Sequence, residues 1–479
     1  MSFQQPADTA RRRVLLDCSA TPLHLSPTGI PRVLRQYLLH APVAARSLGI
    51  DLVPVEIAAP GKFRRFREAN EPALRAARRP LTVGGIALKI LLQVLRYLGP
   101  VLRQTLLLIG ALLPLRVVTK TTARWARSVD KFIPKLRRRF PSLTAPEEPV
   151  PVLPGDILLV PGCWYNVDIS DYAAARAQGV EIVFLLHDIM PVTLPLIHEY
   201  PWRFQFKKKL ERALEIVDHY YCISWQTFND LKQVAAQRGR AVTGAVAYNG
   251  FDPELATRAP AALAASDSAL LAQRPWLMVG TVEPKKGHAD AIAALESLWA
   301  QGYARPLVII GGEGWHTDEI LEPIRTSPWL GTRLFWLQGA DDSTLAAFYQ
   351  GAQGLIGASI AEGFGLPLLE AAACGTPVIC RDLPVFREIL GARGTYFSNR
   401  TELADAISAL EAPDAWAAAR AGMSGFAWRN WQQSITAVLA DVIRPQRSVD
   451  CVIEATDPER SVQAPATGMG GGRGQREHV

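Results

Sequence analysis

The chain has 479 residues, of which 49% are hydrophobic and 20% charged, as in an ordinary globular protein with room for two or three domains. Its six cysteines lack C-x-x-C spacing and no signal peptide precedes the first predicted strand, which favours the reducing cytosol over secretion. The net charge of +7 is uneven, because residues 61–140 hold nineteen basic and three acidic residues, a net of +16 that leaves −9 elsewhere. Composition alone does not choose between nucleic acid, anionic lipid and no partner for this basic segment.

The first predicted strand is Arg13 to Asp17, and a loop that contains glycine, Pro27 to Arg32, leads from it into a helix. Gly29 would let this loop approach a ligand closely, because glycine has no side chain. An ordinary strand-to-helix turn is the alternative interpretation.

Residues 61–140 are predicted to be a basic, helical insertion. Between positions 81 and 118 the chain is very apolar, yet Lys89, Arg96 and Arg103 recur at seven-residue spacing, which places them on one helical face. No stretch reaches about 18 uninterrupted apolar residues, and a Gly-Pro pair should break the helix. We therefore expect amphipathic helices on an anionic membrane surface, with a packed helical subdomain or a true membrane span as alternatives. Nucleic acid is not an expected partner, because leucines rather than stacking aromatics separate the arginines.

An α/β pattern resumes after this segment, with strands predicted at 155–160 and 180–186. His187 and Asp188 follow the second of these strands directly, at the end of the strand where ligands bind in open α/β sheets. A simple polar pair is the alternative for these two side chains. Ser224 follows another predicted strand and is placed to cap the next helix.

The most informative segment is E-G-F-G-L-P-L-L-E, from Glu362 to Glu370, which places two carboxylates around a glycine turn that opens a helix. Gly363 and Gly365 permit a positive φ angle, and Pro367 suits the first helical turn. The free N–H groups of such a helix start favour an anion such as a phosphate. Buried strands are predicted on both sides of this unit, so we expect a ligand that carries phosphate and hydroxyl groups to bind over the turn.

These residues resemble the family-four retaining nucleotide-sugar glycosyltransferases, whose hallmark is written E-G-F-G-L-P-x-x-E. Other pieces match in the same order: Gly280 to Gly287 resembles the donor-phosphate loop, Leu307 to Gly312 the following strand and glycine turn, and Asp342 to Ala352 the D-x-x-L-x-x-x-Y-x-x-A helix. The resemblance covers about residues 275 to 445. It implies a GT-B fold, an α/β architecture of two Rossmann-like domains that face a cleft, here with a helical basic insertion in the first domain.

The resemblance also implies roles for single residues. The catalytic group would be Glu362, which holds the hydroxyls of the donor sugar, together with His187 in the cleft and Lys286, which stabilises the leaving diphosphate. Glu370 would bind the ribose. The remaining predicted donor-binding residues are Gly29, Thr281, Lys285, Phe364, Gly365 and Leu366. Many relatives have an arginine where this chain has Thr281, and Lys285 replaces a usual arginine, which removes a planar, bidentate donor.

The sequence pattern and the family resemblance together predict the domain boundaries. Residues 1–255 form an acceptor-side Rossmann-like domain, and 275–425 form the nucleotide-sugar-binding domain. The ranges between and beyond them are a linker at 256–274, a helix at 426–445 that crosses back to the first domain, and a disordered tail at 446–479.

The resemblance implies a retaining hexosyltransferase. The E-P-K-K form of the donor loop resembles a subgroup that transfers mannose in bacterial surface polysaccharides, so GDP-mannose is the expected donor and a lipid-linked glycan the expected acceptor. We expect a location on the inner face of the plasma membrane. A catalytically silent, membrane-docked partner of a polysaccharide complex is one alternative, and a GT-B epimerase or phosphorylase is another.

No cofactor and no metal are expected beyond the nucleotide sugar itself. Asp341 and Asp342 superficially suggest a cation site, but an aspartate before Ser-Thr-Leu is better explained as a helix cap.

Overall fold

The computed structural model describes residues 12–19, 29–66, 148–197, 201–258, 263–314, 318–444 and 446–453. Most of the predicted insertion, from residue 67 to 140, therefore lies outside the described residues, and so does the chain from residue 454 onward. Within Phe63–Val150 the structure describes a short antiparallel pair, β3 (Lys62–Arg65) with β4 (Pro149–Val150).

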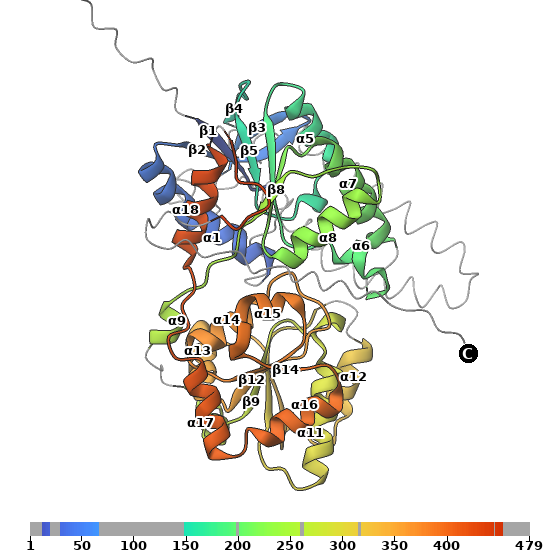
Figure 1. Ribbon diagram of the computed structural model, residues 1–479, viewed down its shortest axis with the longest axis vertical. Helices are drawn as coiled ribbons and strands as arrows, with labels where there is room; N and C mark the ends of the chain where they lie inside the picture. The colour runs from blue at the N-terminus through green and yellow to red at the C-terminus, as the bar shows by residue number, and fades with distance from the viewer. Residues whose placement is uncertain are drawn as a thin grey trace, which may run out of the picture. The chain divides into compact units, whose positions relative to one another are not determined.

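The N-terminal sheet has parallel strands in the order β2-β1-β5-β6-β7-β8, flanked by helices (Figure 1). Five of these strands, β1, β5, β6, β7 and β8, are almost continuously buried, as expected when helices cover both faces of a parallel sheet, whereas β2 is largely half-buried or exposed. The strands are β1 (Arg13–Asp17), β2 (Asp51–Ala59), β5 (Ile157–Val160), β6 (Glu181–Leu186), β7 (His219–Cys222) and β8 (Gly244–Val246). The helices are α1 (Ile30–Leu48), α5 (Ile169–Arg176), α6 (Met190–Thr193), α7 (Trp202–Ile216) and α8 (Trp225–Ala236), with 3₁₀ turns η2 (Trp164–Asn166) and η3 (Pro195–Ile197).

The C-terminal sheet is fully parallel, with the order β11-β10-β9-β12-β13-β14. Numbered from its own first strand, this is the 3-2-1-4-5-6 order of the Rossmann fold, in which the strand order reverses between β9 and β12. The strands are β9 (Trp276–Val279), β10 (Leu307–Ile310), β11 (Leu334–Leu337), β12 (Gly354–Gly357), β13 (Val378–Arg381) and β14 (Thr395–Phe397). The helices are α11 (His288–Ala300), α12 (Asp318–Thr326), α13 (Asp342–Gly351), α14 (Leu366–Ala373), α15 (Pro384–Leu390), α16 (Arg400–Ala409) and α17 (Pro413–Gly422).

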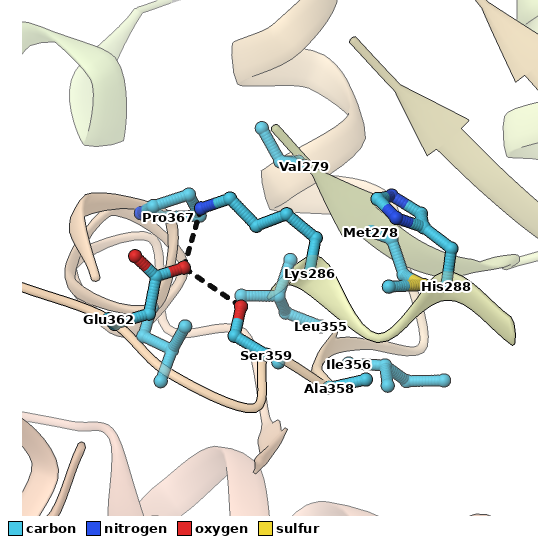
Figure 2. A pocket seen from close by; sticks show the side chains of 12 residues that line it. Met278, Val279, Lys286, His288, Leu355, Ile356, Ala358, Ser359, Glu362 and Pro367 are labelled. Carbon is cyan, nitrogen blue, oxygen red and sulfur yellow. Dashed lines mark hydrogen bonds and ion pairs between the residues drawn. The ribbon is translucent and has the colours of Figure 1, made fainter. Parts of the chain in front are cut away.

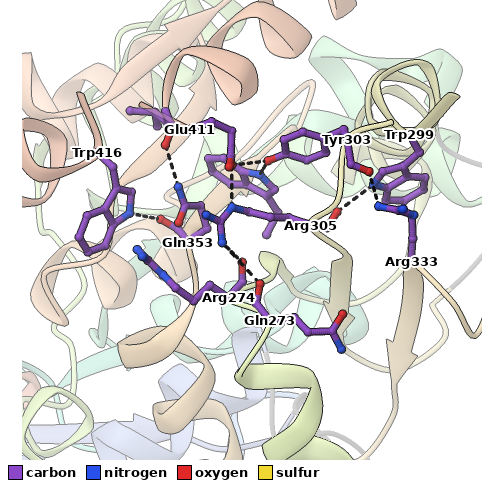
Figure 3. Close-up of polar contacts among 11 residues, drawn as sticks. Gln273, Arg274, Trp299, Tyr303, Arg305, Arg333, Gln353, Glu411 and Trp416 are labelled. Carbon is purple, nitrogen blue, oxygen red and sulfur yellow. Dashed lines mark hydrogen bonds and ion pairs between the residues drawn. The ribbon is translucent and has the colours of Figure 1, made fainter. Parts of the chain in front are cut away.

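Polar contacts join the chain segments that lie at the amino ends of the C-terminal strands (Figure 3). The Glu411 carboxylate accepts hydrogen bonds from Tyr303 Oη at 2.7 Å and from Arg305 Nε at 2.6 Å. Arg274, the second residue before β9, lies with its guanidinium 4.1 Å from the ring centroid of Trp416 on α17. The chain segments that enter and leave this domain are therefore held together, at the end of the sheet opposite the ligand-binding edge.

The chain returns to the N-terminal sheet after α17. Helix α18 (Trp431–Val442) begins with a capping box formed by Asn430 and Gln433, and it packs against α1. The predicted linker at 256–274 contains the short helices α9 (Glu254–Thr257) and α10 (Ala265–Leu271).

The sequence placed the start of a disordered tail at residue 446, and this boundary is too early. Arg447 pairs with Glu181, and Val452 forms a bridge with Val246 at the end of β8. Polar and charged composition alone did not predict these contacts, because both partners are distant in the sequence. Among the residues that the structure describes, no helix has the length and apolar character needed to cross a membrane.

Candidate active site

Two loops of the C-terminal domain meet where the strand order reverses. One loop joins β9 to α11, and the other joins β12 to α14. Gly287, at the end of the first loop, has a φ angle of 68°, and a Cβ atom there would lie 2.1 Å from the carbonyl oxygen of Ala358. Glycine is therefore required for conformation and for space, and its presence brings the two predicted ligand loops into contact.

Lys286 and Glu362, the two predicted catalytic residues of this domain, form an ion pair that links these loops (Figure 2). Lys286 Nζ lies 2.5 Å from Glu362 Oε1, and the same oxygen accepts a hydrogen bond from Ser359 Oγ at 2.8 Å. Burial alone would raise the pKa of Glu362, but Lys286, Lys285 and the hydrogen bonds lower it below its ordinary value. The site thus holds a charged carboxylate and a cation together in a small pocket.

The same pocket is lined by His288, which the sequence analysis did not single out. Burial and the charge of Lys286 lower the pKa of His288 to about 4, so its imidazole is neutral at physiological pH. The signal available in the sequence was its position directly after the donor loop, at the start of α11.

Lys285 lies in the same loop and faces carboxylates rather than solvent. Its Nζ is 3.5 Å from Glu283 Oε1. Burial would lower the pKa of Lys285, yet the charges of Asp188, Glu283 and Glu362 raise it above its ordinary value. Thr281 is half-buried in this loop.

The turn before α14 has the predicted form with one difference. Gly365 has a φ angle of 112° and is the residue that caps the helix start. Gly363 does not have a positive φ angle, contrary to the prediction. Instead, a Cβ atom at Gly363 would lie 2.1 Å from the carbonyl oxygen of His187, so glycine is needed here for close approach.

The start of α14 leaves backbone N–H groups ahead of the first helical hydrogen bond. The first helical hydrogen bond runs from Leu368 N to the carbonyl of Gly365, so the N–H groups of Phe364, Gly365 and Leu366 precede the bonded part of the helix. The Phe364 ring is buried against Tyr248 and Trp428, with centroid distances of 6.2 and 5.9 Å. Phe364 and Leu366 can therefore serve an anion through their backbone.

Glu370 is 2% exposed, and both carboxylate oxygens have protein partners. Oε1 accepts from Arg32 Nη1 at 2.7 Å, and Oε2 accepts from Tyr349 Oη at 2.9 Å. Arg32 and Tyr349 were not predicted as site residues, although each stands in a motif of the sequence. Arg32 closes the loop of Gly29, and Tyr349 is the tyrosine of the D-x-x-L-x-x-x-Y-x-x-A helix.

His187 is buried at the carboxyl end of β6, and its ring is oriented by one contact. Its Nε2 lies 2.8 Å from the carbonyl oxygen of Pro161. Because a carbonyl only accepts, Nε2 carries the proton and Nδ1 is left as an acceptor. Burial lowers the pKa of His187 despite opposing contributions from Pro161 and Asp188, so the ring is neutral. Its backbone carbonyl, not its ring, is the part that reaches Gly363.

Gly29 caps α1 with a φ angle of 64°, and a Cβ atom there would meet no atom within 4 Å. Its positive φ angle explains the glycine, and open space beside the backbone is compatible with the predicted approach of a ligand.

Among the described residues, no group of three or more His, Cys, Asp or Glu side chains is placed to hold a metal ion. Asp341 caps α13 by accepting a hydrogen bond from Thr344 N at 2.7 Å, as the sequence predicted. The predicted independence of a metal cofactor stays a prediction.

Two Rossmann-like sheets, with the predicted ligand loops at the point of strand reversal of the second, define a GT-B fold. Residues 272–416 match the family of glycosyl transferases group 1, so the predicted resemblance of this part of the chain to a glycosyltransferase is confirmed.

The chain is similar to several known proteins. It is 33% identical over 332 residues to the serotype-specific mannosyltransferase WbdA of Escherichia coli. The aligned region covers 64% of this chain and 39% of WbdA. It is 34% identical over 167 residues to the O-antigen chain mannosyltransferase B of Escherichia coli, covering 32% of this chain and 42% of that protein. Among solved structures, the sucrose-phosphate synthase of Thermosynechococcus elongatus superposes with a TM-score of 0.55 at 18% identity, covering 90% of this chain and 97% of the other. The chain thus spans about two-fifths of the length of these curated relatives.

Proposed function

We propose that the protein is a retaining hexosyltransferase that moves mannose from GDP-mannose onto a lipid-linked glycan during synthesis of a bacterial surface polysaccharide. The observation that carries the proposal is the Lys286–Glu362 ion pair at the strand reversal, beside the free N–H groups of α14. This arrangement offers a cation and N–H dipoles to a diphosphate, and a charged carboxylate to sugar hydroxyls.

The diphosphate of the donor is assigned to Lys286, Lys285 and the backbone N–H groups at the start of α14. Negative charge grows on the leaving diphosphate as the sugar–phosphate bond breaks, and a fixed cation stabilises that state more than the bound substrate. Lys285 and Lys286 are the basic residues of the loop from Gly280 to Gly287, so they supply its positive charge.

The ribose is assigned to Glu370. Its buried carboxylate is held by Arg32 and Tyr349, and these contacts fix the orientation of its oxygens before a ligand arrives. Ribose hydroxyls that approach Glu370 would compete with the Arg32 guanidinium for Oε1. Arg32 therefore belongs with the donor-binding residues in this proposal.

The sugar is assigned to the pocket side of Glu362, near His187. With Nε2 donating to Pro161, the neutral His187 ring offers an acceptor at Nδ1 and its backbone carbonyl near Gly363. Retention is proposed to follow from attack on the same face as the leaving group, with the departing phosphate taking the proton of the acceptor hydroxyl. In this scheme the protein supplies position and charge, and no side chain becomes covalently attached to the sugar.

The choice of mannose, the polysaccharide context and the acceptor come from relatives. The names of the two curated relatives describe a serotype-specific mannosyltransferase and an O-antigen chain mannosyltransferase. In this proposal the acceptor is carried on a lipid at the inner face of the plasma membrane, where the net charge of +16 in residues 61–140 would favour anionic lipid.

A panel of radiolabelled sugar nucleotides, incubated with the purified protein and membranes from the source organism, tests the proposal. We expect label from GDP-mannose to enter a lipid-extractable or polymeric fraction, with less from other donors. Absence of transfer from every donor would favour the silent partner, and conversion of the free nucleotide sugar without transfer would favour an epimerase.

A further inference from the structure

The edge of the N-terminal domain that follows His187 exposes apolar side chains. Leu196 is 91% exposed, Phe204 45%, Leu194 39% and Trp202 38%. Single exposed apolar residues are common on soluble proteins, but four within consecutive elements form an unusual surface. We call this surface the α6–α7 patch, and define it as these four residues with the exposed Lys207 and Lys208.

A hydrogen bond and two ring contacts hold the patch in place. Arg203 Nη1 donates a hydrogen bond of 2.5 Å to the carbonyl of Pro195, which ties the first turn of α7 to η3. The Trp202 ring packs on Phe206 at a centroid distance of 5.6 Å, and Lys208 Nζ lies 4.6 Å from the centroid of the Phe204 ring. The exposed apolar groups thus belong to a packed helix start rather than to a loose end.

The charge of the patch is mostly positive. Residues 194–210, which span it, contain four basic residues, Arg203, Lys207, Lys208 and Lys209, and one acidic residue, Glu199. The N-terminus of α7 carries the positive end of the helix dipole, where acidic side chains are favoured and basic ones are not. Arg203 lies in this first turn, whereas Lys207 and Lys208 lie beyond it along the helix.

We propose that the α6–α7 patch docks on an anionic lipid bilayer. Leucines, a tryptophan and lysines side by side fit the boundary between acyl chains and anionic headgroups, where aromatic rings and lysines are stabilised. The charge of the patch disfavours two other occupants. The segment 61–140 carries +16 and would be repelled, and so would the same patch of a second copy.

The patch also has a suitable place in the fold. Helix α6 begins at Met190, three residues after His187, so a docked patch lies one short helix away from the predicted sugar site. This use of the patch, to present a lipid-linked acceptor, rests on the proposed function. Lipid binding itself does not, since it is measured without donor or acceptor.

Flotation of the full chain with vesicles tests the proposal. Vesicles of phosphatidylcholine, with and without phosphatidylglycerol, are mixed with wild type and with the double variant Leu196→Asp, Lys208→Glu. A matched control, Leu330→Asp with Arg393→Glu, makes the same change in net charge at exposed residues of the C-terminal domain. We expect wild type and control to float with the anionic vesicles, within about twofold of each other, and the patch variant to bind about tenfold more weakly.

Two outcomes would overturn the proposal. One is equal flotation of the patch variant and wild type, which would assign any lipid binding to other parts of the chain, and the other is no flotation of the wild type. A thermal melt by circular dichroism shows whether the double variant of the patch folds. The variant Leu196→Trp keeps the surface apolar and should retain lipid binding. Mannose transfer in detergent is measured in parallel, so a failure of the proposed function is seen separately from a failure of the patch.

Discussion

At the scale of single residues, the site depends on the ion pair between Lys286 and Glu362. Both side chains are largely buried, and the loops that carry them are held by the contact of Gly287 with Ala358. The pair presents opposite charges in a pocket where solvent screening is weak, so each charge acts strongly on a bound ligand. Removing either charge should therefore affect turnover more than folding.

Glu362→Gln and Lys286→Ala are each expected to reduce the turnover of mannose transfer by about tenfold or more. The expected cause is loss of a charge that contacts the sugar or the leaving diphosphate. Initial rates at saturating donor, together with thermal melts, provide the measurement. The control is Arg387→Ala, which removes an exposed ion pair with Asp382 in the same domain and should leave the rate near wild type. Near-normal rates in both site variants would remove the catalytic assignment.

The ion pair also predicts a dependence of stability on pH. The pKa of Glu362 is lower in the folded protein than its ordinary value of 4.5, so the unfolded state binds the proton more tightly. The pair therefore contributes stability above about pH 4.5, and this contribution is lost as the pH falls through the folded pKa. The urea midpoints of wild type and Glu362→Gln should differ at pH 7 and converge toward pH 3. A gap that stays constant over this range would contradict the assignment.

At the scale of elements, the sequence predicted strand positions well and contacts between distant segments poorly. The predicted strands at 13–17 and 180–186 match β1 and β6 within one residue, because buried parallel strands are continuous apolar runs. The partnership of Arg32 with Glu370 could not be predicted, since the two residues are 338 positions apart and neither carries a local signal for the other. Glycine at 363 was predicted to allow a positive φ angle, which the structure does not show; the position instead requires close approach to the His187 carbonyl, a partner that depends on tertiary structure.

The contact between the two ligand loops gives a prediction for Gly287. Alanine there would suffer both the left-handed backbone and a Cβ atom 2.1 Å from the Ala358 carbonyl. Gly302 provides the matched control, because it also has a positive φ angle but no atom within 4 Å of its Cβ position. We expect Gly302→Ala to cost about 1 kcal/mol of stability and leave activity intact, and Gly287→Ala to cost more and to reduce activity. Equal losses of stability and activity in the two variants, measured by denaturant unfolding and transfer rate, would contradict the account.

At the scale of the whole molecule, the GT-B fold was predictable because a short motif of family four fixes the second domain. The segment 67–140 and the chain from 454 lie outside the described residues, so their predicted roles stay predictions. The α6–α7 patch was not predicted from the sequence, since exposure depends on how α7 packs on its neighbours.

Mannose transfer by the full chain is predicted not to need a metal ion. Two lysines and the N–H groups of α14 are available to a diphosphate, so we expect mannose transfer to continue in excess EDTA at near the untreated rate. A control with added magnesium or manganese should change the rate little. Complete loss of transfer, restored by either ion, would show that a cation is needed and would direct attention back to Asp341 and Asp342.

The most direct test of the central claim is the structure of the product formed from GDP-mannose. The purified protein is incubated with the donor and an isolated acceptor, and the anomeric configuration of the new linkage is read by nuclear magnetic resonance. Because the mannose of the donor is α-linked, a retaining hexosyltransferase predicts an α-mannoside. A β-mannoside, or an acceptor that gains no mannose, would contradict the account.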